Sequence, residues 1–490
     1  MKLPVEIYST DSVRRMDRDA IEVAGIPGYT LMERAATAAL ELARRSWPAP
    51  GRWHLVCGGG NNGGDGYVLA RLATQQGISV RISWLVPPDA LRGDAAKAYR
   101  DLVDAGGAPA AWDGQLDEEA GLLVDAILGS GLERDVEDRF ADAVGALCCH
   151  PAPVLALDIP SGISGDTGEV MGCAVRAAET ITFVGLKAGL FLGDAPDFVG
   201  KLSFSDLGSP RSVRTPPALL RRIDGEAVDA LLAPRPRASH KGDFGHLLLV
   251  GSGPGMAGAI RLAGEAALRT GAGRVSIATH PAHAAAIAAG CPELMCHGVG
   301  DRADLRTLLE RSGTVAIGPG LGTDGWAEDL LEAVLASGLP MVVDADGLNL
   351  LAQSPRRSLR WILTPHPGEA ARMLRTSSSE VQAGRVDTVK RLAEQFGGTV
   401  VLKGAGTLVS SINGPPWLCT DGNPGMAAPG MGDVLTGVIG ALLAQGCTLE
   451  QAAVAGVKVH AQAGDRAAGA TPRGLMASDL MPALRIEVNP

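Results

Sequence analysis

The chain lacks the composition of several common functional classes. Of its 490 residues only 4% are aromatic, and its formal net charge is −10. Scarce aromatic side chains and a negative charge argue against the stacking platforms and basic surfaces that bind nucleic acids. The same charge argues against binding to an acidic membrane surface.

The sequence also lacks an apolar run of 18 residues, and its start, MKLPVEIYSTDSVRRMD, contains no apolar signal core. Its eight cysteines form no CxxC pair and have no ligand-spaced histidine partner. This usage indicates buried thiols in a reducing compartment rather than zinc sites or disulfides. We therefore expect a cytoplasmic protein.

A dinucleotide fingerprint for hydride transfer is missing as well. Residues 58–63 read GGGNNG instead of GxGxxG, and no acidic residue follows at a strand end ~20 positions later. The glycine-rich segment therefore does not predict a standard redox Rossmann domain.

What the sequence does have is a regular alternation of apolar runs and helical patterns. In the first half, this pattern predicts helices at 10–25 and 30–46, with Thr10 and Thr30 as caps. A series of buried strands and helices follows. The predicted strands are 52–59, 78–86, 121–128, 153–160 and 179–185, and the predicted helices between them are 64–77, 93–106 and 136–150. This order predicts a mostly parallel sheet covered on both faces.

The pattern breaks at residues 208–222, which are rich in proline and arginine and suit a linker. A second strand series then begins, with strands predicted at 244–252, 273–280, 314–320, 340–347, 360–366 and 398–404. The halves share no motif, so we predict two unrelated α/β domains, residues 1–210 and residues 222–490.

Polar clusters follow three strands of the first half, where parallel sheets bind ligands. They are the segment 61–65 (NNGGD), Asp125 and Asp158. Alone, the glycine-rich segment could be a structural turn, and Asp158 a cap. Asp158 follows a buried run, so its carboxylate suits proton transfer. Asn62, Asp125 and Ser161 offer hard oxygens of low charge, which suit a monovalent cation or magnesium.

The motifs GGNNGGDG, DAILGSGL and LDIPSG, in this order, closely resemble those of the NAD(P)H-hydrate epimerase family over about residues 10–210. The resemblance implies a potassium ion on Asn62, Asp125 and Ser161. The implied substrate-binding residues are Asn61, Asn62, Gly63, Gly64, Asp65, Gly129, Ser130, Gly131, Leu132, Glu133, Arg134, Asp135 and Asp158. Ser130 stands where threonine is expected, and it keeps the hydroxyl.

In the second half, the segment APGMGDVLTG (428–437) places Asp433 at the start of a helical run. A helix N-terminus stabilises phosphoryl charge, and the aspartate can take a proton from an attacking hydroxyl. A simple capped helix start is the alternative for this motif alone. Polar clusters at 318–322, 343–349, 364–369 and 401–407 also follow predicted strands.

Together these residues resemble the ribokinase-like superfamily, and within it the NAD(P)H-hydrate dehydratase branch, over about residues 222–490. The resemblance implies Asp433 as base and Glu369 as a contact to magnesium-bound water. It implies substrate contacts at Ala259, Gly322, His366 and Asp433, and nucleotide contacts at Lys403, Gly404, Ala405, Gly406, Thr407 and Gly432. Met431 stands where threonine is common, which a backbone anion site tolerates.

We therefore expect a Rossmann-like three-layer αβα domain followed by a ribokinase-like αβα domain. The expected activities are epimerisation of hydrated NADH and NADPH, with Asp158 as acid/base, and dehydration of the S epimer at the expense of ADP, with ATP as the alternative phosphoryl donor. Potassium, magnesium, ADP and a homo-oligomeric assembly complete the expectation. One alternative is a vitamin kinase of the ribokinase superfamily with an accessory domain. The other is a nucleotide sensor without catalysis.

Overall fold

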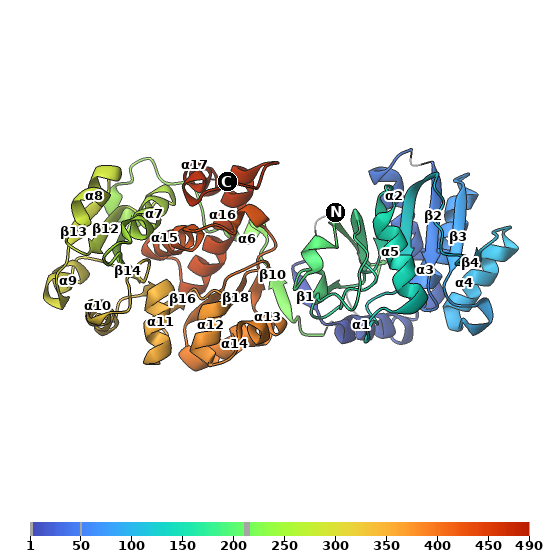
Figure 1. Cartoon of the computed structure of the whole chain (residues 1–490), viewed down its shortest axis with the longest axis horizontal. Coiled ribbons are helices and arrows are strands. Elements are labelled where there is room, and N and C mark those ends of the chain that lie inside the picture. The colour runs from blue at the N-terminus through green and yellow to red at the C-terminus, as the bar shows by residue number, and fades with distance from the viewer. Residues whose placement is uncertain (1–2, 50, 210–215, 490) are drawn as a thin grey trace. The chain divides into compact units, whose positions relative to one another are not determined.

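The computed structural model of the chain describes residues 3–49, 51–209 and 216–489. The chain forms two compact units, Met1–Leu220 and Arg221–Pro490, each with its own sheet and helices (Figure 1). Of the predicted linker at 208–222, residues 210–215 lie outside the described residues.

The first unit contains a parallel sheet with the strand order β4-β3-β2-β5-β6-β7-β9. Its strands are β2 (Arg52–Cys57), β3 (Val80–Trp84), β4 (Ala110–Ala111), β5 (Ala120–Ala126), β6 (Val154–Leu157), β7 (Glu179–Phe183) and β9 (Lys201–Ser205). All five strands predicted for this half are confirmed. The sequence analysis missed β4, whose two residues are exposed, and β9, whose burial is only partial.

Helices cover both faces of this sheet, which confirms the predicted three layers. They are α1 (Thr10–Glu22), α2 (Gly28–Ser46), α3 (Asn61–Gln75), α4 (Gly93–Asp104) and α5 (Asp138–Cys149). Side chains alternate along β2: Leu55 and Cys57 pack in the core shared with α1 to α4, whereas Val56 packs with α5 on the other face. A short parallel pair, β1 (Glu6–Tyr8) and β8 (Leu186–Lys187), completes the unit.

Two predicted helix caps and one helix start were wrong. The hydroxyl of Ser9, not of Thr10, accepts the capping hydrogen bond of α1, while Thr10 donates to Asp166. Helix α2 begins two residues before Thr30, after Pro27. Helix α3 begins at Asn61, so the polar segment forms its first turn rather than a loop before residue 64.

The second unit has the strand order β13-β12-β11-β14-β15-β16-β17-β18-β19-β10. Neighbouring strands in this series are parallel, except that β18 is antiparallel to its two neighbours, β17 and β19. The strands are β10 (Leu220–Arg222), β11 (His246–Val250), β12 (Arg274–Thr279), β13 (Met295–Gly298), β14 (Thr314–Ile317), β15 (Met341–Val343), β16 (Trp361–Leu363), β17 (Thr399–Leu402), β18 (Leu408–Ser410) and β19 (Trp417–Leu418). The six strands predicted for this half are confirmed.

Helices again cover both faces (Figure 1). One group packs in a common core: α7 (Ala257–Arg269), α15 (Met431–Ala444), α16 (Leu449–Ala468) and α17 (Leu480–Glu487). The other side carries α10 (Gly325–Ala336), α11 (Ala345–Gln353), α12 (Pro367–Leu374) and α14 (Arg385–Phe396). Shorter helices are α6 (Gly225–Asp229), α8 (Ala284–Gly290), α9 (Arg302–Leu309) and α13 (Ser378–Ala383). Helix α15 is buried along almost its whole length, so its N-terminus is held rigidly at the sheet edge.

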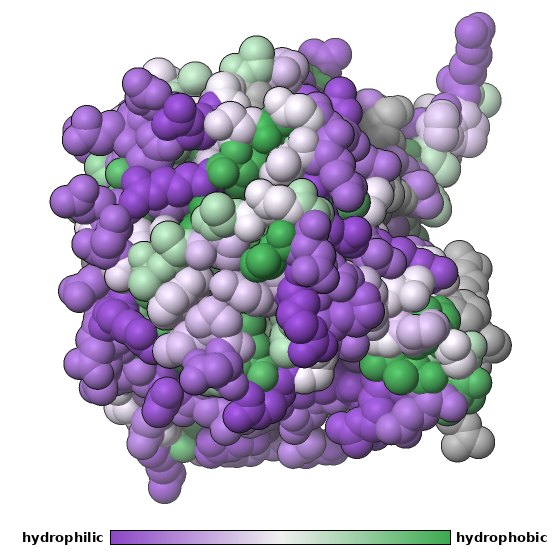
Figure 2. Space-filling view, turned by 90° about the vertical axis from the view of Figure 1, so that its right-hand side faces the viewer, coloured by the Kyte–Doolittle hydropathy of each residue, from purple (hydrophilic) through white to green (hydrophobic). Residues whose placement is uncertain are grey.

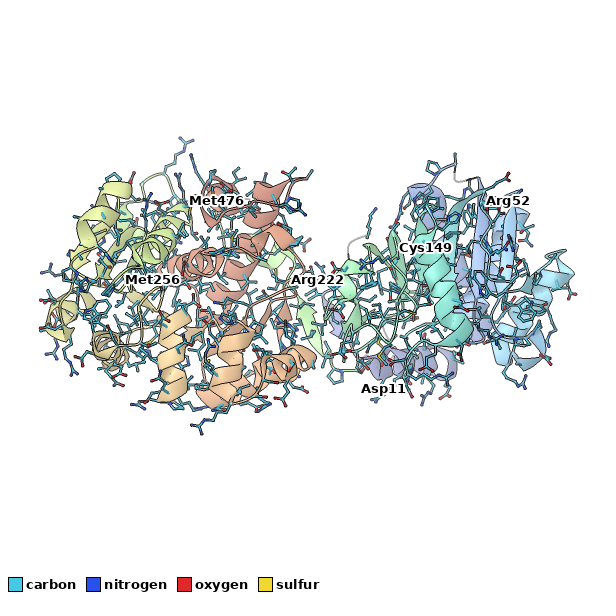
Figure 3. The ribbon with its side chains drawn as sticks, in the orientation of Figure 1. Asp11, Arg52, Cys149, Arg222, Met256 and Met476 are labelled. Atoms are coloured by element: carbon cyan, nitrogen blue, oxygen red, sulfur yellow. The ribbon has the colours of Figure 1, made fainter. Side chains whose placement is uncertain are left out.

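The face of the molecule that Figure 2 draws is mostly hydrophilic, with small, separate hydrophobic areas. Met256 and Met476, both labelled in Figure 3, are among the large apolar side chains that are exposed. Among the described residues, no helix is both long and apolar enough to cross a membrane.

Candidate active sites

A cavity of about 880 Å³ lies at the carboxyl ends of the strands of the first unit. This volume is within the range of small-molecule sites. Of the predicted substrate residues, it is lined by Asn61, Asn62, Asp65, Gly129, Ser130, Gly131, Leu132, Glu133, Arg134 and Asp158. Gly63 and Gly64 are instead buried within α3, and Asp135 is an exposed residue that does not line the cavity.

The glycines beside the cavity allow close backbone packing. A Cβ at Gly58 would lie 1.9 Å from the Ile127 carbonyl oxygen, and one at Gly63 would lie 2.1 Å from the Gly58 carbonyl oxygen. At Gly60, which precedes α3 and lines the cavity, a Cβ would meet no described atom within 4 Å. The first backbone N–H groups of α3 therefore lie at the cavity, where they attract negative charge.

Asp158 reaches the cavity from a strained backbone position. Its φ is 67°, unusual for a residue other than glycine, and such strain concentrates at functional sites. Its Oδ2 accepts from the Ser130 N–H at 3.1 Å, and its Oδ1 pairs with the Lys187 ammonium. Lys187 also donates to Thr182 Oγ1 at 3.0 Å and to the Phe183 carbonyl at 3.2 Å. The carboxylate is thus fixed in direction.

Two further carboxyl groups line the same cavity. Burial raises the pKa of Asp17 to about 6, with Lys187 lowering it and Asp158 raising it. Burial also raises the pKa of Asp65 well above its ordinary value, and Asp158 and Asp17 add to the rise. These carboxyl groups share one lysine, so the cluster can hold a proton near neutral pH.

The three residues predicted to bind a cation meet around the Leu128 backbone. Asp125 is fully buried, and its two oxygens accept from the Ser161 hydroxyl at 2.6 Å and the Ser161 N–H at 2.8 Å. The Leu128 carbonyl accepts from Asn62 Nδ2 at 3.0 Å and from the Ser161 hydroxyl at 3.2 Å. Asn62 Oδ1 is buried and has no hydrogen-bond partner in the described part of the chain. The cluster thus offers one carboxylate and several neutral oxygens, and this low formal charge suits a monovalent cation.

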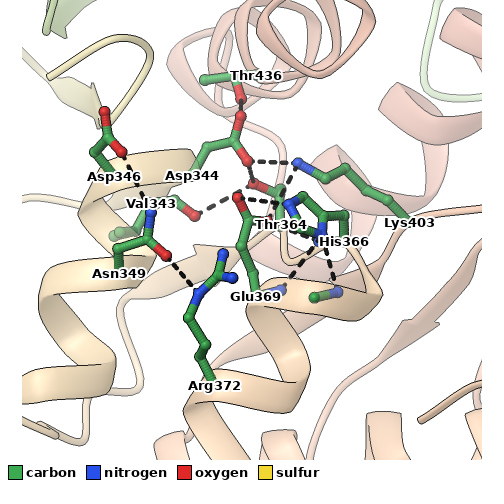
Figure 4. A network of polar contacts seen from close by, with 11 residues as sticks. Val343, Asp344, Asp346, Asn349, Thr364, His366, Glu369, Arg372, Lys403 and Thr436 are labelled. Atoms are coloured by element: carbon green, nitrogen blue, oxygen red, sulfur yellow. Dashed lines mark hydrogen bonds and ion pairs between the residues drawn. The ribbon is translucent and has the colours of Figure 1, made fainter. Parts of the chain in front are cut away.

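In the second unit, a polar network centres on Asp344, which follows β15 (Figure 4). Its Oδ1 accepts from Lys403 Nζ at 2.7 Å and from the Thr364 hydroxyl at 2.8 Å. Its Oδ2 accepts from the Thr436 hydroxyl at 2.8 Å. The network joins the carboxyl ends of β15, β16 and β17 to helix α15.

The surroundings of this network shift the pKa values of Lys403 and His366 in opposite directions. Burial alone lowers the pKa of Lys403, but Asp344 and Glu369 outweigh it, so the pKa is raised and the ammonium is kept. Burial lowers the pKa of His366, and the charges of Lys403 and Arg372 lower it further. His366 Nδ1 accepts from the Gly368 N–H at 2.9 Å, and Glu369 accepts from the His366 N–H at 2.8 Å, which caps α12.

Asp433 lies in the first turn of α15, as predicted. Burial raises its pKa to about 7, with Asp344 adding to the rise and Lys403 opposing it. The preceding Gly430 has φ 87°, and a Cβ at Gly432 would lie 3.3 Å from Lys403 Nζ. A carboxyl group that titrates near neutral pH, a helix N-terminus and an ammonium thus lie close together.

The remaining predicted residues surround this network. The Gly322 N–H donates to Asp346 Oδ2 at 2.8 Å, and a Cβ at Gly320 would lie 3.3 Å from the Cβ of Ala259. In the predicted nucleotide segment, Gly404 and Ala405 are exposed, and Gly406 and Thr407 are half-buried.

That segment is fixed by a buried arginine that the sequence analysis missed. Arg385 Nη2 donates to the carbonyls of Leu402, Lys403 and Gly406 at 3.2, 3.3 and 3.2 Å. Burial lowers the pKa of Arg385 to about 10. The sequence analysis also missed Asp17, Lys187, Asp344 and Asp346 as individual site residues.

Both halves match families of known proteins. A family model described as NAD(P)H-hydrate dehydratase matches residues 247–485, and one described as YjeF-related protein N-terminus matches residues 28–189. A ribokinase-like superfamily protein from Enterococcus faecalis has a solved structure that is 29% identical, with a TM-score of 0.52. It covers 55% of this chain and 97% of its own.

Full-length relatives match both halves at once. A bifunctional NAD(P)H-hydrate repair enzyme of Coxiella burnetii is 45% identical over 487 residues, which cover 99% of each chain. The Escherichia coli relative of the same description is 42% identical over 491 residues, covering 100% of this chain and 95% of its own. These matches confirm the predicted fold and function and leave no ground for the vitamin-kinase and sensor alternatives. The chain therefore belongs to the bifunctional NAD(P)H-hydrate repair enzymes, which join an epimerase domain to a dehydratase domain.

Proposed function

We propose that residues 1–210 epimerise hydrated NADH and NADPH with Asp158 as acid/base. Residues 222–490 dehydrate the S epimer at the expense of ADP, with Asp433 as base. The observation that carries this assignment is the pairing, in each unit, of a cavity-edge or helix-start carboxyl group with a nearby lysine, Lys187 in the first unit and Lys403 in the second. All eight cysteines are free thiols, which fits the expected cytoplasmic location. We also expect a homo-oligomer.

Epimerisation inverts carbon 6 of the hydrated nicotinamide ring, which carries a hydroxyl next to the ring nitrogen. Either the bond from this carbon to the hydroxyl oxygen or its bond to the ring nitrogen must break and re-form on the opposite face. Breaking the first needs a proton given to the departing water and taken back when water returns, and breaking the second needs the hydroxyl proton taken as a carbonyl forms and returned as the ring closes. Asp158 suits this role because Lys187 and the Ser130 N–H hold its carboxylate toward the cavity.

A potassium ion would bind at Asn62, Asp125 and Ser161. The unpartnered Asn62 Oδ1 supports this proposal, because a buried polar atom without a partner costs free energy unless a ligand satisfies it. The ion would fix the 128–134 segment, which supplies the Ser130 N–H to Asp158. Besides Asp158, the predicted residues that line the cavity would contact the hydrated dinucleotide.

In the second unit, Asp433 would take the proton of the carbon-6 hydroxyl, whose oxygen then attacks the terminal phosphorus of ADP and releases AMP. Phosphate is a better leaving group than hydroxide, so it departs from carbon 6. A proton leaves carbon 5, and the reduced ring is restored. Lys403 and the N–H groups at the start of α15 would stabilise the transferred phosphoryl charge.

The ligands would occupy different strand ends of this unit. Residues 403–407 and Gly432 would hold ADP, and Glu369 would contact magnesium-bound water. Ala259, Gly322 and His366 would contact the hydrated nicotinamide nucleotide. The buried Arg385 supports the nucleotide assignment because it holds the carbonyls of this segment inward.

The test is to incubate mixed hydrate epimers with ADP, magnesium and potassium and to follow the absorbance of reduced nicotinamide. The full chain should recover both epimers. Asp158→Asn should recover the S fraction and then stall at the rate of spontaneous epimerisation, whereas Asp433→Asn should recover both epimers ~10²–10⁴ times more slowly than the full chain. Complete recovery by either variant at the normal rate would reject its assignment.

A further inference from the structure

A second hollow lies beside the network of the second unit. It has a volume of about 580 Å³ and is lined by Thr323, Asn349, Ala352, Gln353 and Arg372. These residues follow β14, β15 and β16, which are neighbours in the sheet. The proposed nucleotide segment follows β17, beyond β16. The hollow therefore lies on the side of the site where substrate contacts are proposed, not on the side proposed for ADP.

A chain of hydrogen bonds orients the only charged residue of this lining. The Gly322 N–H donates to Asp346 at 2.8 Å, Asn349 Nδ2 donates to Asp346 Oδ1 at 3.2 Å, and Arg372 Nε donates to Asn349 Oδ1 at 2.9 Å. Figure 4 shows Arg372 extending from α12 to Asn349 on α11. The Asn349 amide is bonded at both ends, so its oxygen fixes the direction of the guanidinium.

The rest of the guanidinium is available to a ligand. Within the described ranges, Nη1 and Nη2 of Arg372 donate to no carbonyl or carboxylate, and the side chain is exposed. A Cβ at Gly368 would lie 3.8 Å from Arg372 Nη1 and 3.2 Å from His366 Nδ1. Arg372 therefore connects the surroundings of Gly322 and His366, which are two of the proposed substrate contacts. A planar guanidinium with free terminal nitrogens binds phosphate oxygens in pairs.

We infer that this hollow binds a phosphate group of the hydrated dinucleotide, with Arg372 as its anchor and Asn349 as the positioning residue. The inference rests on the proposed function of the second unit. Both hydrated NADH and hydrated NADPH carry the central diphosphate, and hydrated NADPH carries one more phosphate on its adenosine ribose. Either source presents the same anionic oxygens to the guanidinium.

The test is steady-state kinetics of full-length Arg372→Gln with the S hydrate of NADH and, separately, of NADPH. Hydrogen bonds to charged groups predict that KM for the dinucleotide rises roughly 10- to 100-fold. KM for ADP should be unchanged. The matched control is Arg360→Gln. Arg360 is also exposed, but it immediately precedes β16 and therefore lies at the amino ends of the strands, away from the proposed site at their carboxyl ends. Thermal unfolding of each variant checks the fold.

The two substrates separate the two phosphate sources. Equal increases in KM identify the central diphosphate, and an increase confined to hydrated NADPH identifies the ribose phosphate. A dinucleotide KM that matches the control, or an increase in KM for ADP instead, would overturn the inference. Failure of wild type and Arg360→Gln to turn over either hydrate would count against the proposed function itself.

Asn349→Leu tests the positioning role. It should raise the same KM by a smaller factor, and it should add little in the double variant with Arg372→Gln, because both act through one contact. Independent, multiplying effects of the two substitutions would show that Asn349 does not act through Arg372.

Discussion

Both units pair a lysine with an aspartate at the carboxyl ends of strands, but they bury opposite partners. In the first unit the Lys187 side chain is 2% exposed and that of Asp158 is 16% exposed. In the second unit the Asp344 side chain is 2% exposed and that of Lys403 is 17% exposed. A ligand therefore meets a carboxylate in the first unit and an ammonium in the second. The first suits proton transfer and the second suits binding of phosphate.

The largest loss of activity is expected from a change at Asp433. In the second unit the more exposed partner of the ion pair is the Lys403 ammonium, which cannot act as a base, so the base must be another residue. Asp433→Asn should lower the rate of dehydration of the pure S epimer by ~10²–10⁴, the usual contribution of a general base. ADP binding, measured by calorimetry, should persist because the backbone supplies it. Asp158→Asn is the matched control and should leave this reaction intact. Near-normal turnover by Asp433→Asn would assign the base elsewhere.

The two lysines should differ in their effects on stability. Removing one partner of a buried ion pair costs about 3–5 kcal/mol, because the remaining charge is left uncompensated. Lys403→Met leaves the more deeply buried Asp344, so its unit should lose more stability than the first unit loses in Lys187→Met. Hydrogen exchange in increasing urea measures each unit separately. An equal or larger loss in Lys187→Met would contradict this reading of the burial difference.

The pH dependence of dehydration should follow Asp433. Burial raises the pKa of Asp433 to about 7, and its carboxylate form is the proposed base. Below this pH, kcat/KM should therefore fall by about tenfold per pH unit as the carboxylate is protonated. A profile that stays flat down to pH 5 would argue against Asp433 as the group that titrates.

Most of the fold and part of each site could be predicted from local sequence. Uninterrupted apolar runs identified the long buried strands, and Asp158 and Asp433 adjoin distinctive glycine-containing motifs. The ion-pair partners of Asp158 and of the predicted Lys403 could not be found in this way, because Lys187 lies 29 positions from Asp158 and Asp344 lies 59 positions from Lys403. Such pairs form only when the sheet brings strand ends together.

The sequence did contain a weak indication of the two missed ion-pair partners, but it was ambiguous. Lys187 is a charged residue within an apolar segment, and Asp344 directly follows a buried strand. The cap of α1 shows the same limit, because Ser9 and Thr10 both carry suitable hydroxyls and only the backbone conformation selects Ser9. The chemical type of the side chain alone therefore did not show which of these two adjacent residues caps the helix.

A more moderate effect is expected from a change in the proposed cation site of the first unit. Asn62→Ala removes the unpartnered oxygen while Asp125 and Ser161 keep their hydrogen bonds to one another. The potassium concentration for half-maximal epimerisation should rise by roughly tenfold, about what one lost ligand to a charged group costs. Asn61→Ala is the neighbouring control for the ion requirement. An unchanged potassium requirement in Asn62→Ala would place any ion elsewhere.

The smallest effect is expected from separating the units. Each has its own core and its own polar clusters, so residues 222–490 should convert the S epimer with ADP at close to the normal rate. Residues 1–210 should equilibrate the epimers and restore no NADH. A folded but inert first fragment would show that its chemistry needs residues beyond position 210.

The close backbone contacts of Gly58 and Gly63 have a consequence for saturation mutagenesis of this chain. Any side chain at either position collides with a carbonyl oxygen, so substitutions there should deplete the protein from cells as well as its activity. Gly60 has room for a side chain, and it lines the cavity, so we expect a side chain there to interfere with the ligand and not with the fold. Its variants should accumulate normally and still fail to repair hydrates. Abundance and activity scores should therefore agree at Gly58 and Gly63 and diverge at Gly60, and the divergence would mark the boundary between scaffold and ligand.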